Sequence, residues 1–253
     1  MVERWGGQWD LRDVKTLFVC CGDPDDFIRS RHGRFVDWFR AGVGDHATLH
    51  EVDARTESLT PAHLDGFDAM MISGSAHAAY EPHPWIPALE ATIRDAVLVR
   101  EMPVLGVCFG HQVVAQALGG KVIRNPRGRE IGTAWIRPND DGRTSALFAG
   151  LGDPFPIQLT HCDTVAKPPP GARVLATSEK DDCQAFTVGS AWCVQFHPEI
   201  THDVIRSYVQ SRREIITNEG IDVNALLDGI RETDAGPELF RRFVAYAKEC
   251  SPR

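Results

Sequence analysis

The run 103–108, PVLGVC, is apolar without alternation and passes directly into a helical pattern beginning FGHQVVAQ. Such a run predicts a strand that is buried on both faces, as in a parallel sheet covered by helices. Three more β-rich runs, at 16–21, 47–54 and 69–74, alternate with amphipathic helical patterns, as βαβ units do. We therefore expect an α/β fold whose central sheet is mostly parallel and flanked by helices.

The second half of the chain has a different pattern. Short β-rich segments separated by Gly, Pro and Asp fill residues 121–198, which predicts antiparallel strands added to the parallel core. From His202 onward, amphipathic patterns predict helices that end near Lys248. Because α/β folds often run to about 250 residues as one unit, we expect a single domain over 1–253. Its catalytic core would cover about 15–200 and a C-terminal helical extension about 201–253.

Composition excludes several classes of protein. The formal net charge of -8 and the pI near 5.7 argue against nucleic-acid binding, which normally needs a basic face. No stretch approaches the roughly 20 apolar residues that cross a bilayer, and the N-terminus lacks the apolar core of a signal peptide. Seven cysteines, an odd number without a CxxC pair, indicate reduced thiols and no structural zinc site. We expect a cytoplasmic protein that uses no membrane.

Glycines stand two residues before and after Cys108, at the junction of the predicted strand and helix. This spacing is the nucleophile-elbow pattern with sulfur in place of the serine oxygen. A helix that begins after the cysteine presents amides and a positive dipole end, which favour thiolate. Cysteines in this setting also serve redox sensing or proteolysis, and a lone buried cysteine is commonly only structural, so a partner base must decide.

The segment Gln195-Phe196-His197-Pro198-Glu199 supplies that partner. Pro198 disfavours helical backbone at His197, and extended residues two apart point to the same side. His197 and Glu199 can therefore face one site, as a base and the carboxylate that orients it. Each alone is more commonly structural, but together with Cys108 they match a catalytic triad.

The run 69–74 ends in a glycine, at the sheet edge where open α/β folds bind ligands. The backbone amides of Gly74 or Ser75, with that of Phe109 after the cysteine, match the donors of an oxyanion hole. An ordinary turn is the alternative interpretation of this glycine.

Together, GVCFGHQ, QFHPE and ISGS resemble the class I, triad-type glutamine amidotransferase family over roughly residues 15–200. The resemblance implies a flavodoxin-like α/β fold with extra antiparallel strands. It also implies glutaminase chemistry through a γ-glutamyl thioester, with no cofactor and no metal.

Position by position, the resemblance implies that Cys108, His197 and Glu199 are catalytic. It implies further that the remaining motif residues bind the oxyanion or the substrate: Gly74, Ser75, Phe109, Gln112, His161 and Asp163. Cys162 stands where the family commonly has glycine. Gly74-Ser75 departs from the double glycine of many synthase-linked members, and with Pro84-Trp85-Ile86 it resembles a stand-alone branch related to plant γ-glutamyl peptidases.

Three functions follow from these patterns. The first is hydrolysis of a γ-glutamyl amide bond in glutamine or a γ-glutamyl amide or peptide. The second is a glutaminase subunit that delivers ammonia to a separate synthase chain, since Gly119-Gly120-Lys121 lacks the rest of a P-loop. The third is a non-catalytic regulatory module. His77 and His83 lack the spacing of HExxH, so we interpret them as loop histidines.

Overall fold

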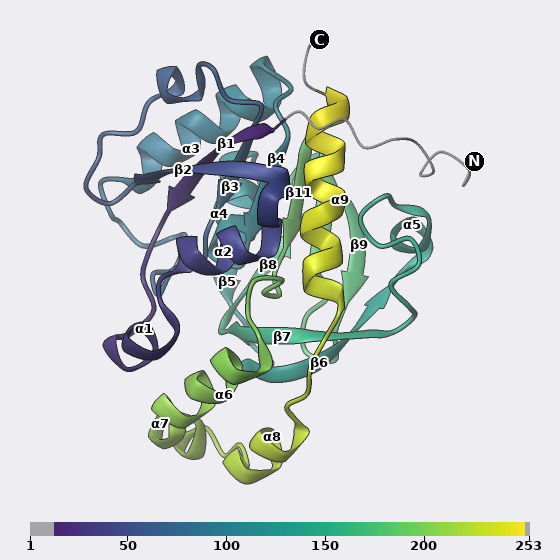
Figure 1. The fold of residues 1–253 in the computed structure, drawn as a ribbon. Helices are drawn as coiled ribbons and strands as arrows, with labels where there is room; N and C mark the ends of the chain where they lie inside the picture. The colour runs from purple at the N-terminus through teal and green to yellow at the C-terminus, as the bar shows by residue number, and fades with distance from the viewer. Residues whose placement is uncertain (1–12, 251–253) are drawn as a thin grey trace.

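The computed structural model describes residues 13–250. Its centre is a nine-stranded sheet in the order β2-β1-β3-β4-β11-β10-β9-β6-β7 (Figure 1). The first five strands in this order pair in parallel, and the remaining pairings are antiparallel. The strands are β1 (Val14–Cys20), β2 (Ala47–Asp53), β3 (Ala69–Ile72), β4 (Val104–Val107), β6 (Glu130–Pro138), β7 (Phe155–His161), β9 (Arg173–Thr177), β10 (Ala185–Val188) and β11 (Ala191–Val194).

The predicted α/β class with a flavodoxin-like parallel core and added antiparallel strands is confirmed, with two differences in the second half. The segment around 191–198 contributes β11, which pairs in parallel with β4. The segment after residue 121 forms β5 (Lys121–Arg124), which pairs with β8 (Asp163–Lys167) in a separate two-stranded sheet. Both segments are short and β-rich, and such patterns do not encode which neighbour a strand takes.

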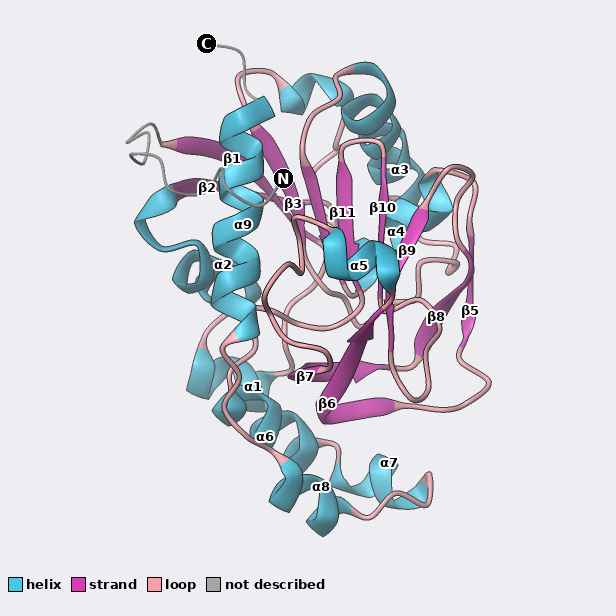
Figure 2. Cartoon of the chain, turned by 90° about the vertical axis from the view of Figure 1, so that its right-hand side faces the viewer, coloured by secondary structure: helices cyan, strands magenta, loops and turns pink. Residues whose placement is uncertain are grey.

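Helices cover both faces of the sheet (Figures 1 and 2). Buried side chains of α2 and α9 pack in one apolar cluster with those of α1, α6, α7 and α8, whereas α3 and α4 belong to a second cluster. The helices are α1 (Asp26–His32), α2 (Phe35–Val43), α3 (Ile86–Arg94), α4 (Phe109–Ala117), α5 (Asp140–Thr144), α6 (His202–Ser211), α7 (Arg213–Asn218), α8 (Val223–Gly229) and α9 (Ala235–Cys250), with 3-10 turns at Gly44–His46 and Pro61–Leu64 and a π-helical turn at Asp95–Val99.

The helices after residue 201 divide into two groups. Helices α6, α7 and α8 lie together beside β6 and β7, away from the parallel strands (Figure 2). Helix α9 returns to the sheet and packs against α2, and Phe240 and Phe243 on α9 are fully buried. Within residues 13–250, no helix combines the length and the apolar character needed to cross a membrane.

Candidate active site

Cys108 occupies the turn between β4 and α4. Its backbone has φ 55° and ψ -102°, a conformation that residues with a side chain rarely adopt. A Cβ on Gly106 would stand 2.6 Å from the carbonyl oxygen of Gly110, and one on Gly110 would stand 2.5 Å from that of Ile72. Only glycine fits at these two positions, so the structure contains the crowded turn that the glycine spacing predicts.

His197 follows β11 and is held on both sides. Its backbone N–H donates to the carbonyl of Gln158 at 2.9 Å, and its Nδ1 lies 2.6 Å from Oε1 of Glu199. Both side chains are almost completely buried, and Nε2 of His197 has no hydrogen-bond partner among the residues described. Because Glu199 accepts from Nδ1, Nε2 is the ring nitrogen left to exchange a proton with a reactant.

Gly74 lies close to the side chains of both Cys108 and His197. A Cβ built on it would lie 3.8 Å from Cβ of Cys108 and 3.4 Å from Cε1 of His197, so both side chains border the end of β3. The N–H groups of Gly74, Ser75 and Phe109 donate no hydrogen bond to any residue within 13–250. These three donors are therefore free to meet a developing oxyanion.

The electrostatics favour an ion pair between the cysteine and the histidine. Burial alone raises the pKa of the Cys108 thiol, but the nearby positive charges of His197 and His161 outweigh it, and the net pKa is lowered. Burial likewise lowers the pKa of His197, but Glu199 and the cysteine more than reverse this and raise it to about 10. Both shifts favour the thiolate and imidazolium pair over the neutral thiol and imidazole.

Two cavities meet at Cys108. The one that we call the arginine cavity has a volume of about 270 Å³ and includes Arg124, Arg129, Gln112 and Asp163 in its lining. The other, the His197 cavity, has a volume of about 180 Å³ and is lined by His197 and by residues of the first strand–helix connection and of α2 and α6. Both cavities share five lining residues: Ser75, Ala76, Cys108, Thr160 and Arg212.

Of the residues predicted to bind the oxyanion or substrate, Ser75, Gln112, His161 and Asp163 line the arginine cavity, Gly74 lines the His197 cavity, and Phe109 lines neither. The side chains in the arginine cavity are partly engaged. His161 is buried, with Nε2 3.0 Å from Oε2 of Glu130 and Nδ1 3.0 Å from the carbonyl of Asp163. Burial lowers the pKa of His161, but Glu130 reverses this and the net pKa is raised. Gln112 donates to Oε1 of Gln195 at 3.0 Å. Direct contact of His161 and Gln112 with substrate stays a prediction.

Sequence analysis did not single out Arg212, which borders both cavities. It lies between α6 and α7, within the stretch interpreted as an extension, and no motif separates it from the neighbouring Arg213. An arginine in an amphipathic helix pattern is usually a solvated residue, so the signal appears only once the chain is folded.

Two clusters bring possible metal ligands together within residues 13–250. The ligand atoms of His77, Glu81 and His83 lie close enough to share an ion, and without one both imidazoles pair with Oε2 of Glu81 at 3.1 and 2.9 Å. Glu130, His161 and Asp181 form the second cluster, which is buried. There Ser178 and Gln184 donate to Glu130 and Thr164 donates to Asp181, while Oδ2 of Asp181 has no hydrogen-bond partner among the described residues.

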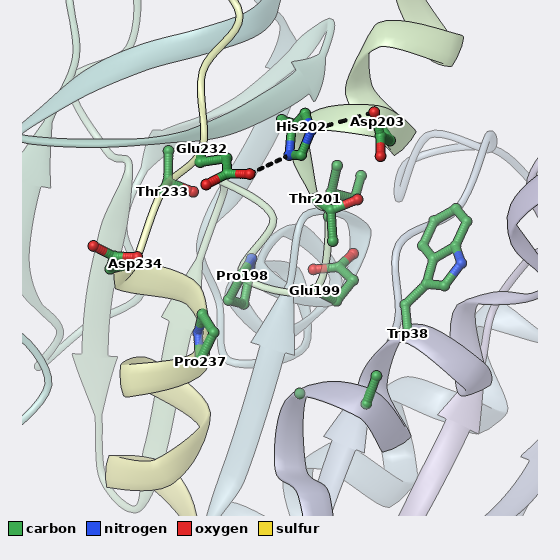
Figure 3. A pocket seen from close by; sticks show the side chains of 13 residues that line it. Trp38, Pro198, Glu199, Thr201, His202, Asp203, Glu232, Thr233, Asp234 and Pro237 are labelled. Carbon is green, nitrogen blue, oxygen red and sulfur yellow. Dashed lines mark ion pairs between the residues drawn. The ribbon is translucent and has the colours of Figure 1, made fainter.

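A third cavity, about 410 Å³ in volume, has Glu199 among its lining residues (Figure 3). The carboxylates of Glu199, Asp203, Glu232 and Asp234 are among its lining side chains, and His202 pairs with Asp203 and Glu232. Neither Cys108 nor His197 lines it, so the reacting atoms lie elsewhere.

Comparisons with known proteins identify relatives of this chain. The family model described as glutamine amidotransferase class-I matches residues 41–213. γ-Glutamyl peptidase 2 of Arabidopsis thaliana is 29% identical over 209 residues, which cover 81% of this chain and 84% of that protein. A glutamine-hydrolysing GMP synthase of Pyrobaculum aerophilum is 34% identical over 170 residues, or 67% of this chain. That match spans only 32% of the synthase.

Solved structures share the fold. A glutamine amidotransferase from Thermotoga maritima has a TM-score of 0.72 at 24% identity, covering 94% of this chain and 99% of its own. One from Methylobacillus flagellatus has a TM-score of 0.73 at 23% identity, covering 95% and 96%. The family model spans well over half of the chain, and the fold agrees with it along nearly its whole length. The chain therefore belongs to the class I glutamine amidotransferase family.

Proposed function

We propose that the protein hydrolyses a γ-glutamyl amide bond, in glutamine or in a γ-glutamyl amide or peptide, through a thioester on Cys108. The observation that carries the proposal is the position of Cys108 on a strained elbow, where two cavities meet beside the His197–Glu199 pair. A buried thiol whose pKa is lowered by an imidazolium is the state that a nucleophile needs.

In the first half of the reaction, the Cys108 thiolate attacks the γ-carbonyl carbon. The carbonyl oxygen takes the negative charge and meets the free N–H groups of Gly74 or Ser75 and of Phe109. Each such donor contributes about 3 kcal/mol in comparable sites. The C–N bond breaks as His197 gives its Nε2 proton to the leaving nitrogen, and ammonia or an amine departs.

In the second half, His197 is neutral and acts as the base. It takes a proton from a water molecule, whose oxygen attacks the thioester carbonyl. The C–S bond breaks, glutamate leaves, and the thiolate and imidazolium are restored. Glu199 keeps the ring oriented and stabilises its positive charge throughout.

The proposed chemistry indicates which part of the substrate each cavity would hold. The leaving nitrogen must approach Nε2 of His197, so the leaving amine occupies the His197 cavity. The acyl portion extends from the same carbonyl in the other direction, into the arginine cavity.

The similarity to GMP synthases supports a second candidate function. The GMP synthase relatives match this chain with about a third or less of their own length, so their amidotransferase portion works as part of a larger protein. The second candidate is thus a glutaminase subunit that passes ammonia to a separate synthase chain. The matches to the γ-glutamyl peptidases, which span 84% and 78% of those proteins, support the stand-alone hydrolase over it.

The test follows release of glutamate from glutamine, γ-glutamyl dipeptides and γ-glutamyl alkylamides by the purified protein. We expect turnover without a partner, and we expect Cys108→Ala to reduce it by at least about 10³-fold, as loss of a triad nucleophile does elsewhere. The Cys250→Ala variant is the control, because Cys250 is exposed and lines none of the cavities described.

Each outcome separates the candidates. Brisk cleavage of a γ-glutamyl peptide or alkylamide supports the hydrolase, whereas slow activity confined to glutamine supports the subunit. Absence of turnover on every substrate, or equal activity in Cys108→Ala, would contradict both and favour a regulatory module.

A further inference from the structure

The guanidinium of Arg212 is held at the boundary of the two cavities. Its NH1 group donates to Oγ1 of Thr160 at 2.6 Å, and its central carbon lies 4.6 Å from the ring centroid of Tyr208. A hydrogen bond on one side and an aromatic face on the other fix the group in place. The side chain thus presents a positive charge to the two cavities that Cys108 also lines, at little further cost in side-chain entropy.

That charge has no acidic partner within 4.0 Å among residues 13–250. Arg129, which lines the same cavity, provides the contrast, because Glu219 neutralises it through two hydrogen bonds of 2.7 and 2.9 Å. A partly buried guanidinium without a counter-ion is costly to keep, particularly in a protein whose net charge is -8 and where Arg129 of the same cavity is paired. Its remaining N–H donors suit a planar anion with two oxygens.

We propose that Arg212 binds the α-carboxylate of the γ-glutamyl group and so restricts substrates to those whose α-carboxylate is free. This rests on the proposed function and names the part of the substrate that the site reads. Arg124, which also lines the arginine cavity, adds positive charge there.

The charges that line the two cavities favour an anionic group on the acyl part of the substrate over one on the leaving amine. In the His197 cavity, Asp23 is paired with Arg34 and Arg55. Asp25 accepts from the Ile28 N–H and the Ser211 hydroxyl, has no basic partner within residues 13–250, and disfavours a carboxylate on the leaving amine. The arginine cavity contains three arginines against one lining carboxylate, that of Asp163, which accepts from the Tyr80 hydroxyl at 3.0 Å. An anionic group on the substrate is therefore best placed on the acyl side.

The experiment compares two substrates that differ only at the α-carboxyl group: glutamine and glutaminamide, in which this carboxylate is a neutral amide. For Arg212→Met, we expect kcat/KM for glutamine to fall about 10- to 100-fold, the range for a lost hydrogen bond to a charged group. The loss should appear chiefly in KM. For glutaminamide, the same variant should change kcat/KM less than about 3-fold, and Arg212→Lys should restore part of the loss on glutamine.

Arg213→Met is the matched control, since it removes the same charge from the next residue, which is exposed and outside both cavities. Equal losses on glutamine and glutaminamide would show that Arg212 only supports the fold through Thr160 and Tyr208. A loss confined to γ-glutamyl dipeptides, with glutamine unaffected, would place its partner on the leaving group. Either result overturns the proposal.

A binding measurement keeps this test separate from the proposed chemistry. Calorimetric titration of Cys108→Ala with glutamate or glutamine requires no turnover. We expect Arg212→Met in that background to weaken binding about 10-fold or more. Unchanged binding would reject the role of Arg212 even if hydrolysis is confirmed, and a weakened Kd would support it even if no substrate is turned over.

Discussion

Among the six cysteines whose pKa departs from its ordinary value, only Cys108 has a lowered one. Burial raises the pKa of the other five, that of Cys20 to about 11. The difference comes from the imidazolium of His197, because Cys108 is buried like Cys20, Cys21, Cys183 and Cys193. A lowered pKa means that the thiolate forms at a lower pH than in an ordinary thiol and is lost as the pH falls through the pKa of the folded protein.

This leads to a prediction at the residue scale. Iodoacetamide should alkylate Cys108 fastest of the seven, and the rate should decline as the pH falls through the lowered pKa of Cys108. The His197→Asn variant should lose the imidazolium while burial remains, so the Cys108 pKa should rise and the rate at pH 7 should fall at least about tenfold, the factor for one pKa unit. Mass spectrometry of digested protein measures each site, with Cys250 as the exposed reference. A variant profile that overlies the wild type would contradict the ion pair.

The candidate catalytic residues that belong to sequence motifs could be predicted from the sequence, whereas Arg212 could not. Cys108, His197 and Glu199 stand in local patterns whose backbone geometry follows from Gly and Pro, and the structure brings them together at one sheet edge. The place of Arg212 depends instead on how α6 packs beside β7, a contact between segments 52 residues apart. Helical periodicity determines which face of a helix is apolar, but it does not specify which strand that face meets.

At the scale of elements, helix α9 packs against residues 197–199, the segment that contains His197 and Glu199. Its first turn packs so closely on the backbone of Pro198 that a Cβ on Gly236 would overlap the Pro198 carbonyl. Pro198 lies between His197 and Glu199, so this contact bears on the position of the base. The glycine is required by this close approach, since its own backbone is ordinary helix.

We therefore predict that Gly236→Ala lowers kcat/KM by about 10²-fold, the typical effect of a 1 Å misplacement of a reacting group. Overpacking should also destabilise the fold by about 1–3 kcal/mol. Steady-state kinetics and thermal unfolding of each variant measure the two effects.

Two alanine variants make the comparison specific. In Gly42→Ala, the new Cβ would meet the Phe240 ring at 2.5 Å, which disturbs α9 one helical turn after Gly236. In Gly229→Ala, it would meet open space. Gly42→Ala should lose stability with less than about a 3-fold effect on kcat/KM. If it impairs catalysis as much as Gly236→Ala, the contact with Pro198 has no particular role.

For the whole molecule, we propose a single domain over 1–253 despite the late helices. Phe240 of α9 lies 5.3 Å from Phe39 of α2, measured between ring centroids, and Phe39 lies 4.9 Å from Phe18 of β1. The core thus joins the beginning and the end of the described chain. Sequence analysis interpreted residues after 200 as an extension because an amphipathic pattern fits a peripheral helix and a core helix equally well.

This arrangement predicts one cooperative unfolding transition. Differential scanning calorimetry of the Cys108→Ala protein should give a calorimetric enthalpy equal to the van't Hoff enthalpy. A separate low-temperature transition that removes only helical signal would instead indicate that α6–α9 unfold independently of the sheet.

In the proposed reaction, the meeting of the two cavities at the Cys108 sulfur also determines the order in which products leave and reactants enter. Once the amine has departed from the His197 side, the acyl group still fills the arginine side, so the next reactant enters where the first product left. Water is the usual entrant, but a second amine that fits the vacated space would receive the glutamyl group instead. The enzyme would then follow ping-pong kinetics, and its balance between hydrolysis and transpeptidation would be governed by the His197 cavity alone.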